Sequence, residues 1–189
     1  MIHKIKTVNN YDFFECSSAL QKSIRRGLED EALFWMVELS ISNYNEYIWK
    51  RLRIISSEDV GLAEPHISSE IMALYDLYKE QAKKKDEKHY PERLFTVHAV
   101  IMLCRAKKSR LIDWQTCYVF GCHTNRFRPV PDWAFDKHTE KGKKLGRGFA
   151  HFFAEGCQLN NHTILPGEDE AMENAKNALG GNCNSLFNQ

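Results

Sequence analysis

The sequence predicts an all-α fold, a multi-helix bundle, and three observations support that prediction. Apolar residues recur with helical spacing in several segments, for example at Leu28, Ala32, Trp35, Met36 and Leu39. No stretch of useful length alternates apolar and polar residues as a half-buried β-strand does. The chain has 189 residues, of which 43% are hydrophobic and 27% charged, so it can bury a core and wholesale disorder is not expected.

In the first half of the chain, helices are predicted over residues 19–26, 28–42, 44–57 and 67–85. Ser18 is a suitable N-cap for the first helix, and Gly27 is suited to end it. The short links predict that the first three helices pack as antiparallel neighbours. Residues 58–65 contain both glycine and proline and predict a tight connection between helices.

In the second half, helices are predicted over residues 92–105, 109–123 and 168–179. Pro91 opens the first of them, a position that proline favours. Residues 125–155 contain prolines, glycines and many basic residues, which indicates an ordered irregular segment followed by a short helix. We therefore expect three parts, an N-terminal arm (1–17), a helical domain (18–158) and an acidic, partly mobile tail (159–189).

The charges are distributed unevenly along the chain. Residues 101–150 contain eleven basic and four acidic residues, whereas the sequence after His151 contains five acidic residues and one basic residue, Lys176. A basic middle segment favours an anionic partner such as nucleic acid, and a solvated face with balanced charges is the alternative. The candidate nucleic-acid-binding residues are Lys137, Lys141, Lys143, Lys144 and Arg147.

Four sequence blocks occur in an order that points to a known family. They are ALQKSIR at 19–25, DEALFW at 30–35, RIISSEDVGLAEP at 53–65 and AVIMLCRAKKS at 99–109. They resemble the helical region that follows the ATPase core in the replication-associated recombination protein A family, which are clamp-loader-like AAA+ ATPases. A looser fifth block covers 129–148, where residues 132–138 replace the His-Leu-Arg-Asn element of the family.

The resemblance covers roughly residues 18–155 and implies a fold like the clamp-loader collar, which in the family holds subunits together. Since nothing before Ser18 is long enough for an ATPase, we expect a collar and oligomerisation module without its motor. Its expected role is a non-catalytic oligomeric scaffold or partner-binding module in DNA replication, repair or recombination. The expected partners are further copies of the chain, a full-length AAA+ relative and DNA.

An enzymatic function is the less favoured alternative. The nearest P-loop candidate, residues 141–148, has its glycines and lysines in the wrong order and no following Ser or Thr. No hydrolase, zinc-protease or kinase signature is present. The alternative is a small enzyme or phosphate-ligand site, for which the candidate residues are Asp136, His138, Thr139, Arg147 and His151. No second carboxylate or activated nucleophile completes a mechanism there.

Metal and cofactor sites are not expected. Cys117, Cys122 and His123, with the later His151 and Cys157, do not have the tight paired spacing of a structural zinc site. The six cysteines are expected to be small apolar residues in a reducing compartment. No apolar run approaches the roughly 20 residues of a membrane span. No signal peptide opens the chain, so we expect a cytoplasmic protein without a membrane partner, with nucleoid association left open.

Three further features are expected to be structural. Ser57, Glu58 and Asp59 are expected to cap and anchor the turn between helices, because neighbouring side chains on a helix do not converge on one ion. His98 is expected to be a core histidine. The four tryptophans are expected to anchor the core and interfaces, and they are Trp35, Trp49, Trp114 and Trp133.

Overall fold

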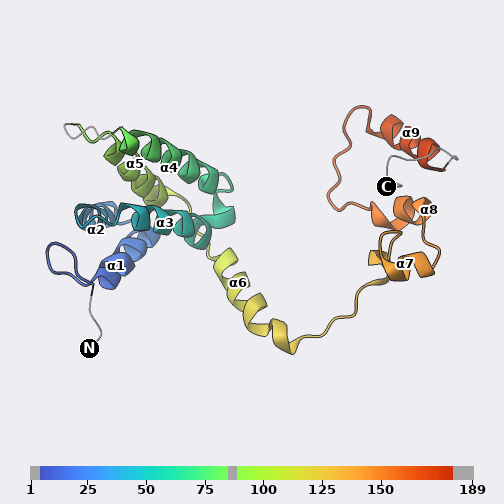
Figure 1. Ribbon diagram of the computed structural model, residues 1–189, viewed down its shortest axis with the longest axis horizontal. Coiled ribbons are helices and arrows are strands. Elements are labelled where there is room, and N and C mark those ends of the chain that lie inside the picture. The colour runs from blue at the N-terminus through green and yellow to red at the C-terminus, as the bar shows by residue number, and fades with distance from the viewer. Residues whose placement is uncertain (1–4, 85–88, 181–189) are drawn as a thin grey trace. The chain divides into compact units, whose positions relative to one another are not determined.

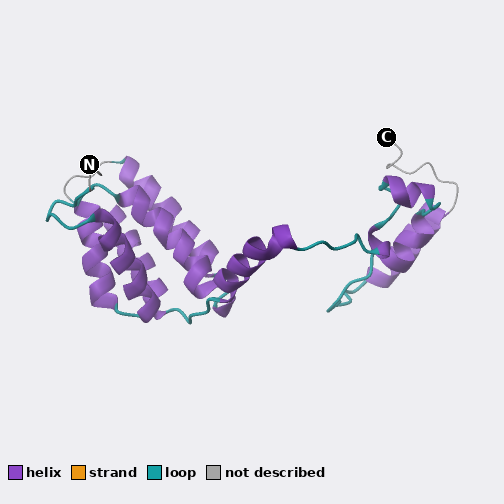
Figure 2. Cartoon of the chain, turned by 90° about the horizontal axis from the view of Figure 1, so that it is seen from below, coloured by secondary structure: helices purple, strands orange, loops and turns teal. Residues whose placement is uncertain are grey.

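A computed structural model describes residues 5–84 and 89–180 of the chain. The all-α prediction is confirmed, since these residues form helices and loops, with one isolated bridge between Lys6 and Asp12 and no strand among them (Figure 2). The chain divides into two compact units, Met1–Arg126 and Phe127–Gln189. The boundaries at 17/18 and 158/159 stay predictions, and the end of the predicted mobile tail, residues 181–189, lies outside the described residues.

The first unit is a helical bundle followed by one further helix (Figure 1). Its helices are α1 (Phe13–Arg26), α2 (Glu29–Ile41), α3 (Asn45–Ile55), α4 (Ile67–Lys83), α5 (Glu92–Arg105) and α6 (Leu111–Cys122). α1 packs mainly on α2, and α4 packs mainly on α5. A π-helical turn (Ser56–Val60) and a 3₁₀ turn (Gly61–Ala63) connect α3 to α4, where the sequence predicts a tight connection.

The first helix begins at Phe13 rather than at residue 19, so the prediction that Ser18 is its N-cap is wrong. The cap is Asp12, whose carboxylate accepts hydrogen bonds from the backbone N–H groups of Phe14 (2.9 Å) and Glu15 (3.2 Å). Phe13 is buried, which places the first turn of the helix in the core. Gly27 ends the helix as predicted, in the left-handed region at φ +70°.

The core of the first unit is built around Trp49, which is fully buried in α3. Its ring lies 5.4 Å from that of Tyr75 and 5.3 Å from that of Tyr78, both on α4. The predicted stripe on α2 is partly different in the structure. Ala32, Met36 and Leu39 are buried and Trp35 is half-buried, but Leu28 is exposed because the helix begins only after it.

His98 is exposed, so the prediction of a core histidine is wrong. α5 buries its face at Thr96, Ala99, Val100 and Leu103. At 100° per residue, position 98 lies well away from that stripe. The apolar residues on both sides of His98 in the sequence concealed this geometry.

The second unit contains short helical segments and one longer helix. They are η4 (Asp132–Ala134), α7 (Glu140–Lys144), α8 (Phe149–His151), the π-helical η5 (Phe152–Gly156) and α9 (Glu168–Gly180). Among its described residues only Gly142 is buried. Local turn chemistry, rather than a large apolar core, therefore holds this unit together. Across both units, no described helix has the length and apolar character needed to cross a membrane.

Candidate interaction surfaces and polar clusters

α6 extends from the bundle of the first unit (Figure 1), and most of its apolar side chains are exposed. None of its residues is buried, and Phe120 and Trp114 are 80% and 62% exposed. Its exposed apolar residues surround the helix, with Leu111, Trp114 and Tyr118 on one face, Phe120 on the opposite face and Val119 between them. A helix that is apolar on all sides is normally buried, so these exposed faces favour a partner.

The first turn of α6 is fixed firmly to the bundle. The backbone N–H of Ser109 donates to the carbonyl oxygen of Asp59 (3.0 Å), and Arg110 lies 3.6 Å from the Glu58 carboxylate. Ile112 packs against Gly61, where an added Cβ would lie 3.2 Å from the Ile112 side chain. The start of the helix is therefore fixed, while the described residues of the first unit leave its apolar faces uncovered.

Arginines flank one of these faces. The Arg110 guanidinium lies 4.9 Å from the centre of the Trp114 ring, and that of Arg126 lies 4.5 Å from the centre of the Tyr118 ring. These cation–π contacts place the guanidinium groups of Arg110 and Arg126 at the edge of the aromatic surface. Aromatic residues and arginine are the types enriched in protein interfaces.

Asp59 is fully buried and joins α1, the π-helical turn and α6. Its carboxylate accepts hydrogen bonds from Arg25 Nε (2.6 Å) and Gln21 Nε2 (3.2 Å). Arg25 also donates to Glu58 (3.1 Å), so one guanidinium holds both neighbouring acids. This network gives the Ser-Glu-Asp block a structural role at the turn.

Lys108 closes the C-terminal end of α5. Its Nζ donates to the carbonyl oxygens of Leu103 (2.6 Å), Cys104 (3.0 Å) and Ala106 (2.7 Å), which lack partners within the helix. Burial lowers the pKa of Lys108 and raises the pKa of the Cys104 thiol to about 11. The AKKS part of the fourth sequence block is thus a helix cap.

Most cations of the predicted nucleic-acid-binding set contact their own unit. Lys137 lies 3.5 Å from the centre of the Phe149 ring, Lys141 lies 4.0 Å from that of Phe135, and Lys144 pairs with Glu140 at 2.7 Å. Arg147 bonds to the carbonyl oxygen of Phe135 (2.9 Å) and to Asp132.

Lys143 has no such partner in the part of the chain that the structure describes. Lys141, Lys143 and Lys144 are exposed on the short helix α7, whereas only 17% of the Arg147 side chain is exposed. Three of the five candidates therefore share one accessible helix.

The residues of the alternative ligand site build a turn. Asp136 Oδ1 accepts from the N–H groups of His138 (3.0 Å) and Thr139 (3.3 Å), and Thr139 Oγ1 accepts from the N–H of Gly142 (3.0 Å). Asp136 and Thr139 are thus brought together as a turn and the N-cap of α7. Among the described residues no hydrogen bond or ion pair joins the His138 or His151 side chain to this turn, and His151 Nδ1 is buried without a partner.

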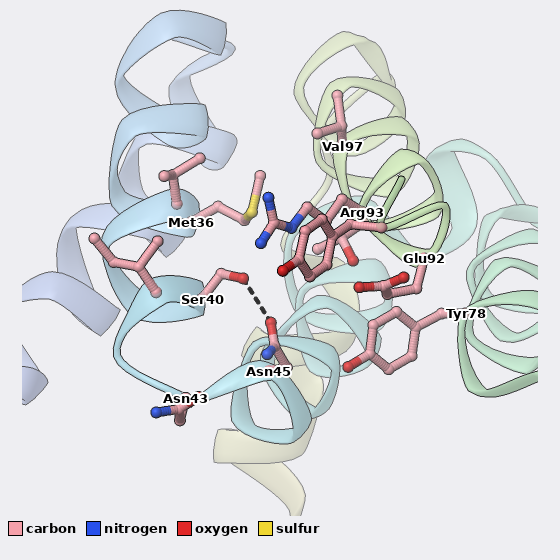
Figure 3. Close-up of a pocket in the computed structure, with 12 residues that line it drawn as sticks. Met36, Ser40, Asn43, Asn45, Tyr78, Glu92, Arg93 and Val97 are labelled. Carbon is pink, nitrogen blue, oxygen red and sulfur yellow. Dashed lines mark hydrogen bonds between the residues drawn. The ribbon is translucent and has the colours of Figure 1, made fainter. Parts of the chain in front are cut away.

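A cavity of about 510 Å³ lies in the first unit between α2, α3, α4 and α5 (Figure 3). Met36, Val37, Ile41 and Val97 provide its apolar wall. Its polar lining residues are Ser40, Asn43, Asn45, Tyr78, Tyr90, Glu92, Arg93 and Thr96. The sequence did not indicate this cavity, because its walls come from segments up to about sixty residues apart.

Within the described segments no group of three or more His, Cys, Asp or Glu side chains could hold a metal ion. Cys16 and Cys104 are buried, Cys122 is half-buried, and Cys117 and Cys157 are exposed, so the expectation of small buried cysteines fits two of these five. Of the exposed pair, Cys117 lies on α6 and Cys157 lies just after η5.

The first unit is thus an all-α bundle with an anchored helix, α6, that exposes apolar side chains. The chain matches the family model "MgsA AAA+ ATPase C terminal" over residues 28–170. The chain belongs to this family of AAA+ ATPase C-terminal regions.

Curated relatives agree with that assignment. The replication-associated recombination protein A of Haemophilus influenzae is 28% identical over 148 residues, which cover 75% of this chain and 31% of that protein. The proteins of the same name from Escherichia coli K12 and Bacillus subtilis are 27% and 29% identical, over 75% and 71% of this chain and 31% of each relative. The matched part thus spans about a third of the length of these relatives.

Proposed function

We propose that this chain is a non-catalytic assembly module in DNA replication, repair or recombination, which self-associates through α6. The single observation that carries the proposal is the apolar helix without a buried residue. The names of the relatives support the link to replication and recombination. A full-length AAA+ relative is a further proposed partner, because the family model describes the C-terminal region of such an ATPase.

The proposed occupant of the α6 surface is a further copy of the chain. At about 200 Å² for an aromatic side chain, Trp114, Tyr118 and Phe120 expose roughly 400 Å² in each chain. Because Phe120 lies on the opposite face, all three rings are covered when the Trp114–Tyr118 face of one copy contacts the Phe120 face of the next. Each such contact buries about 400 Å² from the rings, and with the aliphatic residues of α6 it falls among the weak interfaces below ~1,200 Å².

The test is the molar mass in solution, measured by size-exclusion chromatography with light scattering. We expect an oligomer for the wild-type chain and a shift to monomer for Phe120→Glu and Trp114→Glu, since each places a charge in a desolvated interface. Leu77→Glu on α4 is the matched control, because Leu77 is 42% exposed and lies outside α6. A monomeric wild-type chain at tens of micromolar would refute self-association.

A contact with nucleic acid through α7 is a further part of the proposal. The favouring observation is the exposure of Lys141, Lys143 and Lys144 on one short helix. Surface contacts such as the pair of Lys144 with Glu140 contribute at most about 1 kcal/mol, so phosphates can replace them. Neutralising three or four phosphates gives a slope of log affinity against log salt of roughly −2 to −4.

Replacing the three α7 lysines with alanine should flatten that slope by two or three units, measured by fluorescence anisotropy with labelled single-stranded and forked DNA. Replacing Lys6, Lys22 and Lys50 of the first unit removes the same charge and serves as the control. A slope equally reduced by both triple variants would show non-specific attraction and contradict the α7 contact.

A further inference from the structure

The cavity between α2 and α5 has the size and composition of a binding site. Ligand sites occupy about 300–1,000 Å³ and combine an apolar wall with a few polar groups. Here Met36 is buried behind the cavity, while Val37 and Ile41 on its wall are each about half exposed. The wall is therefore open to a partner side chain.

Several polar groups at this cavity have no hydrogen-bond partner among the described residues. Ser40 donates to Asn45 Oδ1 (2.7 Å), which leaves the Asn45 amide N–H groups available. Among residues 5–84 and 89–180, the Tyr78 and Tyr90 hydroxyls and the Glu92 carboxylate form no hydrogen bond or ion pair. Because polar groups next to apolar walls favour hydrogen-bond partners, these groups are suited to receive a polar ligand.

Arg93 supplies the positive charge of the site. Its guanidinium reaches toward Met36 in the cavity (Figure 3) and lies 3.9 Å from the centre of the Tyr90 ring. No carboxylate of the described part of the chain pairs with it. A guanidinium stacked on a ring is held in place with its N–H donors free, which suits a carboxylate ligand.

Glu92 lies on the other side, beside Tyr78 (Figure 3). Burial raises the pKa of the Tyr78 hydroxyl, and the Glu46 and Glu92 carboxylates raise it further. A ligand must therefore place a carboxylate at Arg93 and N–H donors at Glu92, with an apolar body between them. A free fatty acid lacks the donors, whereas a peptide backbone provides them.

We propose that this cavity binds a short peptide segment of a partner protein, in which a bulky apolar side chain neighbours an aspartate or glutamate. The apolar side chain fills the space beside Val37 and Val97, the carboxylate pairs with Arg93, and backbone N–H groups donate to Glu92. The site lies apart from α6, so it serves a partner other than the copy proposed above.

The experiment measures binding of a fluorescein-labelled peptide, Gly-Ser-Asp-Leu-Phe-Asp-Ser-Gly, to the full chain by fluorescence anisotropy. We expect saturable binding that weakens about tenfold or more for Arg93→Gln, because a charge-assisted hydrogen bond is lost. Val97→Phe should abolish binding by filling the cavity. Peptides with Asn for Asp, or with Ala for Leu and Phe, should also bind at least tenfold more weakly.

Lys50→Gln is the matched control, since it removes one positive charge from an exposed position outside the cavity. A methyl resonance of Met36 should shift on peptide addition in NMR spectra, which locates the ligand even where Val97→Phe perturbs folding. Absence of saturable binding, equal affinity for the neutral peptide, or unchanged affinity in Arg93→Gln would each overturn the proposal. Binding of phenylpropionate in place of the peptide would assign the cavity to a small carboxylate and overturn it as well. Phe120→Glu should leave peptide binding intact, which separates this test from that of self-association.

Discussion

Replacing Asp59 with alanine should destabilise the first unit more than any exposed charge substitution. Asp59 is fully buried and accepts hydrogen bonds from Gln21 and Arg25. After its loss, Glu58 and Asp113 are the carboxylates of the described residues that still pair with Arg25 and Arg110. The three elements that meet at Asp59 then lose their common contact.

The expected loss of stability follows from the burial of the Asp59 carboxylate. Removing one partner of a buried ion pair costs about 3–5 kcal/mol. The Arg25 and Arg110 side chains are 27% and 28% exposed, so water compensates part of that loss. We therefore expect a loss of about 2–4 kcal/mol in the free energy of unfolding, which is a large part of a typical total of roughly 5–15 kcal/mol.

Urea denaturation followed by circular dichroism measures this loss. Glu58→Gln is the matched control, because Glu58 shares both arginines but its side chain is 24% exposed, and we expect it to cost no more than about 1 kcal/mol. A double-mutant cycle of Arg25→Met with Asp59→Ala should give a coupling energy of about 1–3 kcal/mol. A cost below about 1 kcal/mol for Asp59→Ala, or a coupling energy near zero, would refute the reasoning.

Two further predictions concern burial and close backbone contact. Burial raises the pKa of Cys104 to about 11, above that of an unfolded thiol, so its contribution to stability should be constant below about pH 8.5 and be lost as the pH rises toward 11. Urea titrations of the wild-type chain and of Cys104→Ala at pH 7, 9 and 10.5 should show a steeper loss of stability in the wild type. Gly142→Ala should unfold the turn before α7, because the added Cβ overlaps the Asp136 backbone. Gly121→Ala serves as the control, since a Cβ there meets no atom within 4 Å. Hydrogen exchange of residues 136–147 should rise only in Gly142→Ala.

The sequence predicts helix type and order well where apolar periodicity and terminal residues agree. α5 occupies Glu92–Arg105 as predicted, because Pro91 and the polar residues before it leave one starting point. α1 begins earlier than predicted because Asp12, like Ser18, can cap a helix, and only packing of Phe13 decides between them. The cavity beside Arg93 could not be predicted, since it depends on how α2 and α5 meet.

α6 shows why a sequence pattern cannot distinguish a core helix from an interface helix. Trp114 and Trp49 both occur in apolar helical segments, yet Trp49 is fully buried and Trp114 is 62% exposed. The difference arises from anchoring, because Ser109 and Arg110 fix the start of α6 to the acidic turn while no described helix of the first unit covers its other faces. Glu58 and Asp59 therefore both stabilise the bundle and fix the start of α6. On our proposal, loss of Asp59 should weaken self-association even without a change in α6 itself, and light scattering of Asp59→Ala under conditions where the bundle remains folded tests that coupling. An unchanged oligomer mass in that variant would show that α6 assembles independently of its anchor.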